Sequence, residues 1–207
     1  MNNLIEKIDS LKNSEISNRV NNRIKEFKKL NKKSKNKLFK ELCFCILTAN
    51  FNAEKCINIQ KKIGDGFLTL SEDELAERLV ELGHRYPNIR ARYISDSVKC
   101  RGSLKDIIRS SSGEELREWL VKNVRGLGYK EASHFLRNIG FDDFAIIDFH
   151  IIDILVKYNF IKKPKVLTKR RYLEIERLLK EIAIKLGLNL AELDLYLWYI
   201  ETGKILK

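Results

Sequence analysis

The chain has 207 residues, enough to bury a hydrophobic core as one domain or as two small ones. Its 40 Lys and Arg side chains outnumber 28 Asp and Glu side chains, and the formal net charge is +12. No apolar stretch approaches the roughly 20 residues that a membrane-spanning helix needs, and no signal peptide is recognisable, so we expect an intracellular, cytoplasmic protein.

Residues 1–40 supply +8 of the net charge of +12, with twelve basic and four acidic side chains. Within them, Lys28–Lys40 contains seven lysines and no acid. A field of this sign favours a polyanionic partner, either nucleic acid or an anionic membrane surface. Charge alone is equally consistent with an ordinary solvated lysine face of a helix.

The four cysteines come next along the chain. Cys43 and Cys45 lie in an apolar run, and Cys56 and Cys100 stand apart from them. There is no Cys-x-x-Cys pair and no tight cluster of Cys and His, which argues against a zinc site or an iron–sulfur cluster. We therefore expect buried thiols in a reducing compartment and no bound metal.

Apolar residues recur every three or four positions through most of the chain, which predicts helices. The clearest examples are Leu4–Leu11, Leu75–Leu82, Val166–Leu186 and Leu190–Ile200. Ser71 and Glu74 form a capping-box pattern at the start of the second of these. Because only two prolines interrupt the chain and period-two alternation is scarce, we predict an all-α protein of about ten helices, without an internal repeat.

A glycine turn, Gly126-Leu127-Gly128, separates two of the predicted helices. Glycine lets the backbone approach another surface closely, and the second helix begins there with free N–H groups and a positive dipole end. In a basic protein, a backbone phosphate of DNA is the natural occupant of such a site. A single Gly-x-Gly pattern is also typical of an ordinary tight turn between helices.

Lys130 lies in the first turn of that second helix, where the helix dipole disfavours a cation by roughly 0.3–1 kcal/mol. This position suits a lysine whose amine must be neutral, because the neutral amine is a nucleophile. Asp148 follows 18 positions later in the apolar stretch AIIDFHII, where a carboxylate is costly unless it is paired or functional. It is placed to accept a proton or to stabilise positive charge on a sugar, to cap a helix that begins near His150, or to do both.

Several blocks of sequence resemble the helix-hairpin-helix DNA glycosylase superfamily, and within it the short, archaeal-type (type 2) 8-oxoguanine DNA glycosylase/AP lyases. The blocks are Gly126–Gly140 with the run that ends in Asp148, Glu41–Phe51, Leu82–Ile94 and Glu192–Lys207. The resemblance implies two helical subdomains that flank a cleft, all within one catalytic unit. It places a helical barrel at residues 32–143, with the helix-hairpin-helix at about 115–140, and a second lobe at residues 1–31 plus 144–207.

The resemblance also implies a bifunctional enzyme of base-excision repair, which excises 8-oxoguanine and then nicks the abasic site by β-elimination. Lys130 would form a Schiff base with the sugar, and Asp148 would activate the lysine and stabilise the developing positive charge. Gly126 and Gly128 would bind the DNA backbone. No metal or organic cofactor is implied, because the lysine supplies the covalent chemistry. The expected partner is double-stranded DNA containing 8-oxoguanine or abasic sites, bound by a monomer, with no membrane.

Three further roles follow from the resemblance alone. Trp198 would stack on the extruded base, Lys207 would help to distinguish 8-oxoguanine from guanine, and Asn50 would fill the gap left in the duplex. The alternatives are core packing for Trp198, a frayed terminus for Lys207 and a helix C-cap for Asn50. His150 is either a partner of the site or a structural histidine, while His84 and His134 show no partner pattern.

One departure from the family pattern is Phe149, which stands where a basic residue is expected after the aspartate. The segment Tyr86-Pro87-Asn88 is also less basic than the family pattern suggests. The sequence alone leaves two other functions open. The chain could be a noncatalytic helix-hairpin-helix module whose lysine contacts phosphate, or a glycosylase of the same fold for another lesion, such as an oxidised pyrimidine.

Overall fold

The computed structural model describes residues 2–207, and Met1, the first residue of the expected second lobe, lies outside them. Within the described residues the secondary structure is helical, with no strand. The α-helices are α1 (Asn2–Lys12), α2 (Glu15–Asn31), α3 (Lys35–Thr48), α4 (Ala53–Ile63), α5 (Gly66–Thr69), α6 (Glu72–Glu81), α7 (Pro87–Ser97), α8 (Leu104–Ser110), α9 (Gly113–Asn123), α10 (Tyr129–Asn138), α11 (Phe149–Lys157), α12 (Lys169–Leu186) and α13 (Leu190–Thr202). A 3-10 turn, η1 (Val98–Cys100), follows α7. The predicted all-α class is confirmed, with more helices than expected because short ones such as α5 carry little periodic signal.

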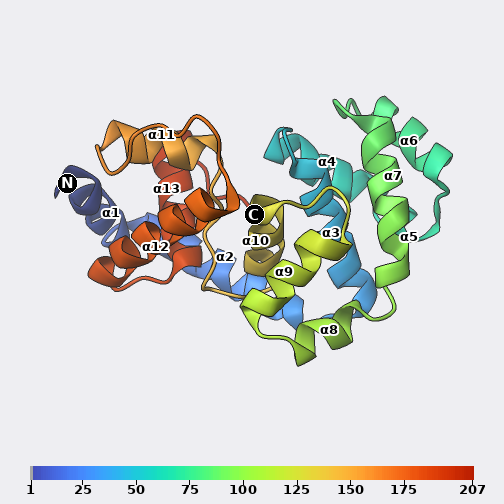
Figure 1. Ribbon diagram of the computed structural model, residues 1–207, viewed down its shortest axis with the longest axis horizontal. Helices are drawn as coiled ribbons and strands as arrows, with labels where there is room; N and C mark the ends of the chain where they lie inside the picture. The colour runs from blue at the N-terminus through green and yellow to red at the C-terminus, as the bar shows by residue number, and fades with distance from the viewer. Residues whose placement is uncertain (1) are drawn as a thin grey trace.

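The helices are grouped around two separate hydrophobic clusters (Figure 1). The first cluster draws its buried residues from positions 38–144, and the second draws them from positions 4–27 and 145–205. The N-terminal residues therefore belong to the second group of helices, the middle of the chain forms the first group, and the C-terminal part belongs to the second group again. Among residues 2–207, no helix is both long enough and apolar enough to cross a membrane.

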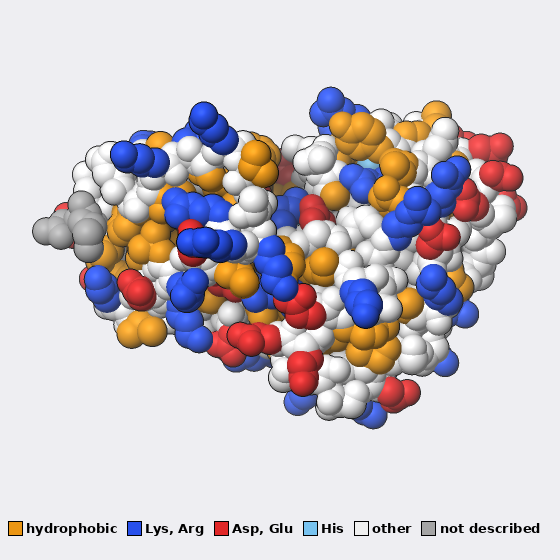
Figure 2. Space-filling model, viewed as in Figure 1, with side chains coloured by type: hydrophobic (Ala, Val, Ile, Leu, Met, Phe, Trp, Pro, Cys, Tyr) orange, Lys and Arg blue, Asp and Glu red, His pale blue; other side chains and the backbone are white. Residues whose placement is uncertain are grey.

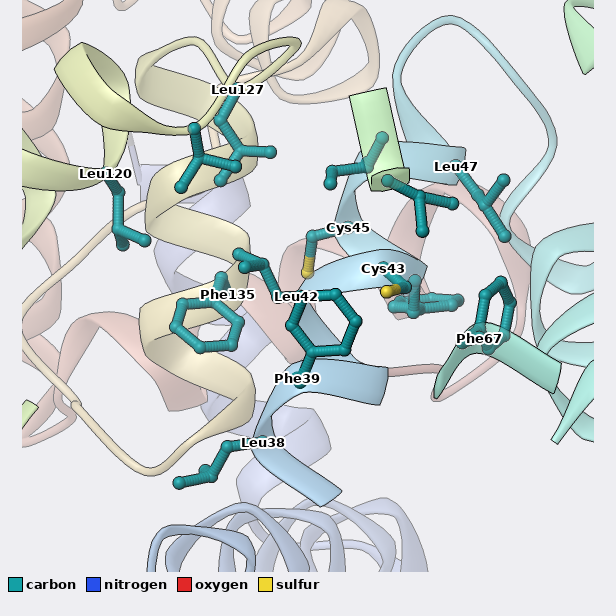
Figure 3. Packing of buried hydrophobic residues seen from close by; sticks show 14 of the residues in the cluster. Leu38, Phe39, Leu42, Cys43, Cys45, Leu47, Phe67, Leu120, Leu127 and Phe135 are labelled. Atoms are coloured by element: carbon teal, nitrogen blue, oxygen red, sulfur yellow. The ribbon is translucent and has the colours of Figure 1, made fainter. Parts of the chain in front are cut away.

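Helix α3 runs through the middle of the first cluster and is buried over most of its length. It contacts α4, α5, α7, α8 and α10, which explains why its sequence is apolar on nearly every side. Figure 3 shows Phe39 and Leu42 of this helix packed toward Phe135 of α10, with Cys43 near Phe67 of α5. All four cysteines of the chain are buried and free, as the sequence indicated.

Local capping signals set where several helices begin. The predicted capping box is present at α6, where the Ser71 side chain accepts from the Glu74 N–H and the Glu74 side chain accepts from the Ser71 N–H. In the second group of helices, the Thr168 side chain caps the start of α12 and the Asn189 side chain caps the start of α13. Residues 203–207 then lead from α13 back to the space between the two groups of helices (Figure 1).

Residues 139–148, hereafter the connecting segment, carry the chain from the first group of helices to the second. Gly140 has a φ of +96°, a conformation that favours glycine. A Cβ atom there would lie 2.9 Å from the Lys28 Cα and 3.2 Å from the Phe27 carbonyl oxygen, both in the backbone of α2. The close approach of the connecting segment to α2 therefore requires glycine at this position.

We expect Gly140→Ala to lower the free energy of unfolding by at least about 1–3 kcal/mol, because it adds backbone strain and a clash with backbone that cannot move aside. Gly102→Ala is the matched control, since its φ is not in the left-handed region and a Cβ there would meet nothing within 4 Å. Its unfolding free energy should stay within about 1 kcal/mol of the wild-type value. Urea denaturation of both variants measures the difference, and equal effects would contradict the close approach.

Candidate active site between the two groups of helices

The predicted glycine turn joins α9 to α10. Gly126 has a φ of +86°, and a Cβ atom there would lie 2.3 Å from Cδ2 of Tyr93 on α7. The turn therefore needs glycine for its backbone conformation and for its contact with the Tyr93 ring. Gly128 is the N-cap of α10, and because it has no side chain it supplies no capping oxygen to the first turn of the helix.

Lys130 lies in the first turn of α10, as predicted, but it has a neighbour that the sequence reading did not consider. The Lys130 Nζ is 2.9 Å from Oε1 of Glu131, and the Lys130 side chain is 25% exposed. The other Glu131 oxygen accepts a hydrogen bond from the Gly128 N–H at 3.2 Å. The Gly128 N–H, which the sequence predicted to be free for an anion, is thus already bound to a carboxylate of the same helix.

Asp148 is the N-cap of α11, and its side chain accepts a hydrogen bond from the Ile151 N–H at 3.0 Å. The capping role predicted for it is confirmed. Burial raises the pKa of Asp148, while the Ile151 N–H and the charges of His150 and Lys130 act in the opposite direction. The charge of Lys130 therefore acts on this carboxylate from 18 positions away in sequence.

Side chains of α12 hold the connecting segment that ends at Asp148. The Glu176 carboxylate accepts from the Ala145 N–H at 3.1 Å, and the Tyr172 hydroxyl accepts from the Ile147 N–H at 3.3 Å. The same hydroxyl donates to the Ala145 carbonyl at 2.6 Å. Because a buried backbone group without a partner is costly, these contacts define the path of the segment and hence the place of Asp148.

Asp194 of α13 adds a second carboxylate close to Asp148. It forms a buried ion pair with Arg137 of α10. Burial raises the pKa of Asp194 to about 6, and the negative charge of Asp148 contributes to the rise while Arg137 opposes it. Sequence reasoning missed Arg137 and Asp194, although each is a charged residue within an apolar helical pattern, which was the available signal.

Lys207 does not fray. Its Nζ lies 2.8 Å from Oε2 of Glu41 on α3, contacts Oε1 of Gln60 on α4, and sits 4.0 Å from the centre of the Phe44 ring. The end of the chain is therefore held against the first group of helices, at the place where Figure 1 marks the C-terminus.

Lys130 and Lys207 belong to one neighbourhood. Both charges lower the pKa of the buried His134, whose pKa burial has already lowered well below its usual range. Both also oppose the rise that burial causes in the pKa of the Cys56 thiol, which reaches about 12. The charges of Lys130 and Lys207 thus act on the same two buried side chains, and the charge of Lys130 also acts on Asp148.

Three aromatic side chains lie in contact in the order Phe149, His150 and Trp198, of which the first two directly follow Asp148 in the sequence and the third belongs to α13. Phe149, 66% exposed, lies with its ring centre 3.9 Å from that of His150, and the His150 ring meets Trp198 edge-on at 4.9 Å. Trp198 is half-buried, and its indole Nε1 is buried without a hydrogen-bond partner among residues 2–207. Both readings of Trp198, as a core residue and as a surface for a flat ligand, fit this partly covered position.

Asn50 follows the last residues of α3, is exposed and has a φ of +55°. This is the left-handed conformation that Asn adopts after a helix C-terminus. The loop is held from α7, because Arg90 Nη2 donates to the Ala49 carbonyl at 2.6 Å. His84, whose Nε2 is 3.1 Å from the Leu47 carbonyl oxygen, supports the same end of α3. In the described chain, no hydrogen bond or ion pair joins Asn50 to the other predicted site residues.

Figure 2 shows a recess between the two groups of helices, with Lys and Arg side chains spread over the face on either side of it. Over residues 2–207, no group of three or more His, Cys, Asp or Glu side chains is arranged to hold a metal ion. The groups available for chemistry at this place are therefore an amine, carboxylates, imidazoles and the N–H groups of a helix start. An amine can act as a nucleophile, and the N–H groups at a helix start can bind an anion, so these groups suit covalent chemistry on an anionic substrate.

Comparisons with known proteins give a consistent result. A family described as 8-oxoguanine DNA glycosylase, Ogg-HhH, matches residues 20–188. The 8-oxoguanine DNA glycosylase/AP lyases of Methanocaldococcus jannaschii and Korarchaeum cryptofilum are each 56% identical over 206 residues, which cover 99% of this chain and 99% and 98% of theirs. The crystal structure of the Methanocaldococcus jannaschii glycosylase/lyase in complex with a 15mer DNA containing 8-oxoguanine matches with a TM-score of 0.96, 53% identity and 99% coverage of both chains.

The proximity of Asp148 and Asp194 is testable without an assay of activity. Asp194→Asn removes a negative charge and leaves Arg137 uncompensated, so we expect the pKa of Asp148 to fall. A carbon-13 NMR titration of the Asp148 carboxyl group measures it. Asp153→Asn, which removes an exposed carboxylate of α11 paired with Lys163, should leave that pKa unchanged. A pKa of Asp148 that does not fall in Asp194→Asn would contradict the coupling.

Proposed function

The chain belongs to the Ogg-HhH family of 8-oxoguanine DNA glycosylases, and on that basis we infer that it is an 8-oxoguanine DNA glycosylase/AP lyase of base-excision repair. It acts on DNA that contains 8-oxoguanine, the substrate present in the solved structure of its Methanocaldococcus jannaschii relative. The observation that supports the mechanism is that Lys130 and Asp148 stand at the starts of two helices, α10 and α11, with the charge of Lys130 acting on the pKa of Asp148. Because its substrate is chromosomal DNA, we propose a cytoplasmic location.

Lys130 is the proposed nucleophile. Its Nζ lone pair forms a bond to C1′ of the damaged nucleotide while the bond from C1′ to the base breaks, and the electron pair leaves with the base. Ring opening of the sugar then gives a Schiff base between Nζ and C1′. Loss of a proton from C2′ expels the 3′ phosphate and nicks the strand. Before attack the amine must leave its ion pair with Glu131, which holds it at 2.9 Å in the free protein.

Asp148 is the proposed partner of the lysine. Its position beside Lys130 lets it take up a proton and stabilise the positive charge that develops on the sugar. Support comes from burial, which raises its pKa and so brings proton exchange nearer to neutral pH. The Ile151 N–H holds the carboxylate in one orientation, so the capping role and the chemical role are compatible.

We propose that the turn at Gly126 and Gly128 binds a backbone phosphate of the DNA. Glu131 occupies the Gly128 N–H, but the following N–H groups of the first turn have no capping side chain because Gly128 supplies none. These donors and the positive end of the helix dipole favour an anion. The net charge of +12 supplies long-range attraction for the same partner.

The base pocket is a further proposal. Trp198 would stack on the extruded base with the ring that its neighbour His150 supports edge-on. Lys207 would contact the base from its place between α3 and α4, where Glu41 and Gln60 hold its ammonium group. Asn50, exposed at the end of α3, would fill the gap in the duplex.

We also propose that the chain works as one catalytic unit of two lobes with a cleft between them. The barrel would span residues 32–143, with the helix-hairpin-helix at about 115–140, and the second lobe would combine 1–31 with 144–207. The two hydrophobic clusters support this division, because the first takes its residues from 38–144 and the second from 4–27 and 145–205. The lysine then belongs to one lobe and the aspartate to the edge of the other.

The lysine mechanism predicts a covalent adduct. Borohydride should trap the wild-type protein on a duplex that contains 8-oxoguanine, because it reduces the Schiff base to a stable amine. Lys130→Gln should form no adduct and should lose strand cleavage by roughly 10³-fold or more. Lys185→Gln, an exposed lysine of α12 in the second cluster's group of helices, is the control and should behave as wild type.

The same assay tests the alternatives. A noncatalytic module would bind the duplex without any adduct, and cleavage by Lys130→Gln would show that another group is the nucleophile. Parallel duplexes that carry thymine glycol or uracil test the choice of lesion. Faster cleavage of either than of 8-oxoguanine would overturn the assigned substrate.

Phe149 stands beside Asp148 where a basic residue was expected, and its ring is 66% exposed. If this position faces DNA phosphate, Phe149→Arg should tighten binding and steepen the dependence of log K on log salt concentration by about 0.9. Fluorescence anisotropy over a salt series measures both. Ile184→Arg makes the same change at a 68% exposed position of α12 and is the control. Equal slopes in the two variants would show that Phe149 does not face the DNA.

A further inference from the structure

Glu41 is a buried carboxylate in the middle of the apolar helix α3, with 5% of its surface exposed. A charge in such a place is costly unless every oxygen is paired. Its Oε1 accepts from the Asn138 side-chain amide at 2.6 Å, and its Oε2 accepts from Lys207 Nζ at 2.8 Å and from the Gln60 amide at 3.2 Å. The proposed mechanism of bond cleavage gives this residue no role.

The contacts of Glu41 continue toward the catalytic carboxylate. The Asn138 side-chain oxygen accepts from Arg137 Nε at 3.2 Å and Nη2 at 2.9 Å. Arg137 in turn pairs with Asp194, whose pKa responds to the charge of Asp148. One buried series of hydrogen bonds and ion pairs therefore runs from the neighbour of Asp148 through α10 to the last residue of the chain.

The far end of this series holds the Lys207 ammonium group on several sides. Glu41 and Gln60 provide acceptors, and the Phe44 ring lies 4.0 Å away in a cation–π contact. The Lys207 side chain is only 19% exposed, whereas a terminal lysine is ordinarily mobile and solvated. Without the Glu41 carboxylate, the ammonium group would lose its only charged partner among residues 2–207.

We propose that Glu41 is a positioning residue for base recognition, which fixes Lys207 so that the chain end reads the extruded base. The inference rests on the proposed function and deepens it, because recognition then depends on a carboxylate of α3 as well as on the terminal lysine. The series through Asn138 and Arg137 gives Glu41 a single orientation, and Glu41 transfers that orientation to Lys207. A residue that can move by an ångström discriminates poorly between bases that differ by a few atoms.

Base excision and cleavage at an abasic site can be measured separately, and this distinguishes a role of Glu41 in base recognition from a general structural role. Excision of 8-oxoguanine requires the base to be read, whereas cleavage at a preformed abasic site involves no base. Loss of the Glu41 contact should therefore slow excision and leave cleavage at the abasic site in place. A variant that merely distorts the fold would slow both reactions together.

The experiment compares Glu41→Gln with the wild type under single-turnover conditions, on a duplex with 8-oxoguanine and on the same duplex with a preformed abasic site. Glutamine keeps the size and a hydrogen-bond acceptor for Asn138 but removes the charge that holds Lys207. We expect excision to fall at least about tenfold, with cleavage at the abasic site within about twofold of wild type. Glu54→Gln is the matched control, because it removes the exposed ion pair with Lys204 in the same terminal segment and should change neither rate.

A double-mutant cycle with Lys207→Ala tests whether Glu41 acts through the lysine. If it does, Glu41→Gln should slow excision little further once the lysine side chain is gone. Gln60→Leu provides a second route should Glu41→Gln fold poorly, since it removes another contact of the ammonium group from a partly buried position. It should reduce excision selectively and by less than Glu41→Gln does.

Three results would overturn the inference while leaving the proposed function intact. These are an unchanged excision rate in Glu41→Gln, an equal loss of excision and abasic-site cleavage, and additive effects in the cycle with Lys207→Ala. A wild-type protein that cleaves the abasic site but does not excise 8-oxoguanine would instead refute the proposed substrate. The two failures are therefore distinguishable in one set of measurements.

Discussion

Two buried arginine–carboxylate pairs, Arg117 with Glu176 and Arg137 with Asp194, are the constraint on which the rest of the structure depends. Each arginine comes from a helix of the first group, and each carboxylate comes from a helix of the second. Because an unpaired buried charge is strongly destabilising, the two groups of helices must keep the register in which these pairs meet. The Glu176 carboxylate also accepts from the Ala145 N–H of the connecting segment, so the first pair helps to determine where that segment runs.

The geometry of the proposed catalytic residues is a consequence of that register. Lys130 stands at the start of α10 and Asp148 at the start of α11, with the connecting segment between the two helices. Arg137 belongs to α10 as well, two turns beyond the lysine, and it orients Asn138 and, through it, Glu41. The ion pair of Arg137 thus connects, through Asn138 and Glu41, to the end of the chain, and it links the proposed site of bond cleavage to the proposed site of base reading.

Much of the candidate site was predictable because its signals are local. The glycine at 126, the lysine in the first turn of a helix and the capping aspartate each depend on neighbours within a few residues, and the structure places all three as the sequence indicated. The contact of Lys130 with Glu131 is equally local, but adjacent residues of a helix do not ordinarily face each other, so the sequence did not predict it. The role of Glu41 could not be predicted from local sequence, because its partner Asn138 is 97 positions away.

The sequence by itself determined the all-α class, the hairpin, the two helix starts and the excess of positive charge, since periodicity, capping and composition act over short distances or none. Only the tertiary structure decided which buried charges meet, that the terminal Lys207 is held by Glu41, and that Phe149 is exposed beside the aspartate. The physical reason is that ion pairs and hydrogen bonds form only between groups a few ångströms apart. Packing of distant helices sets those separations, and no local pattern records them.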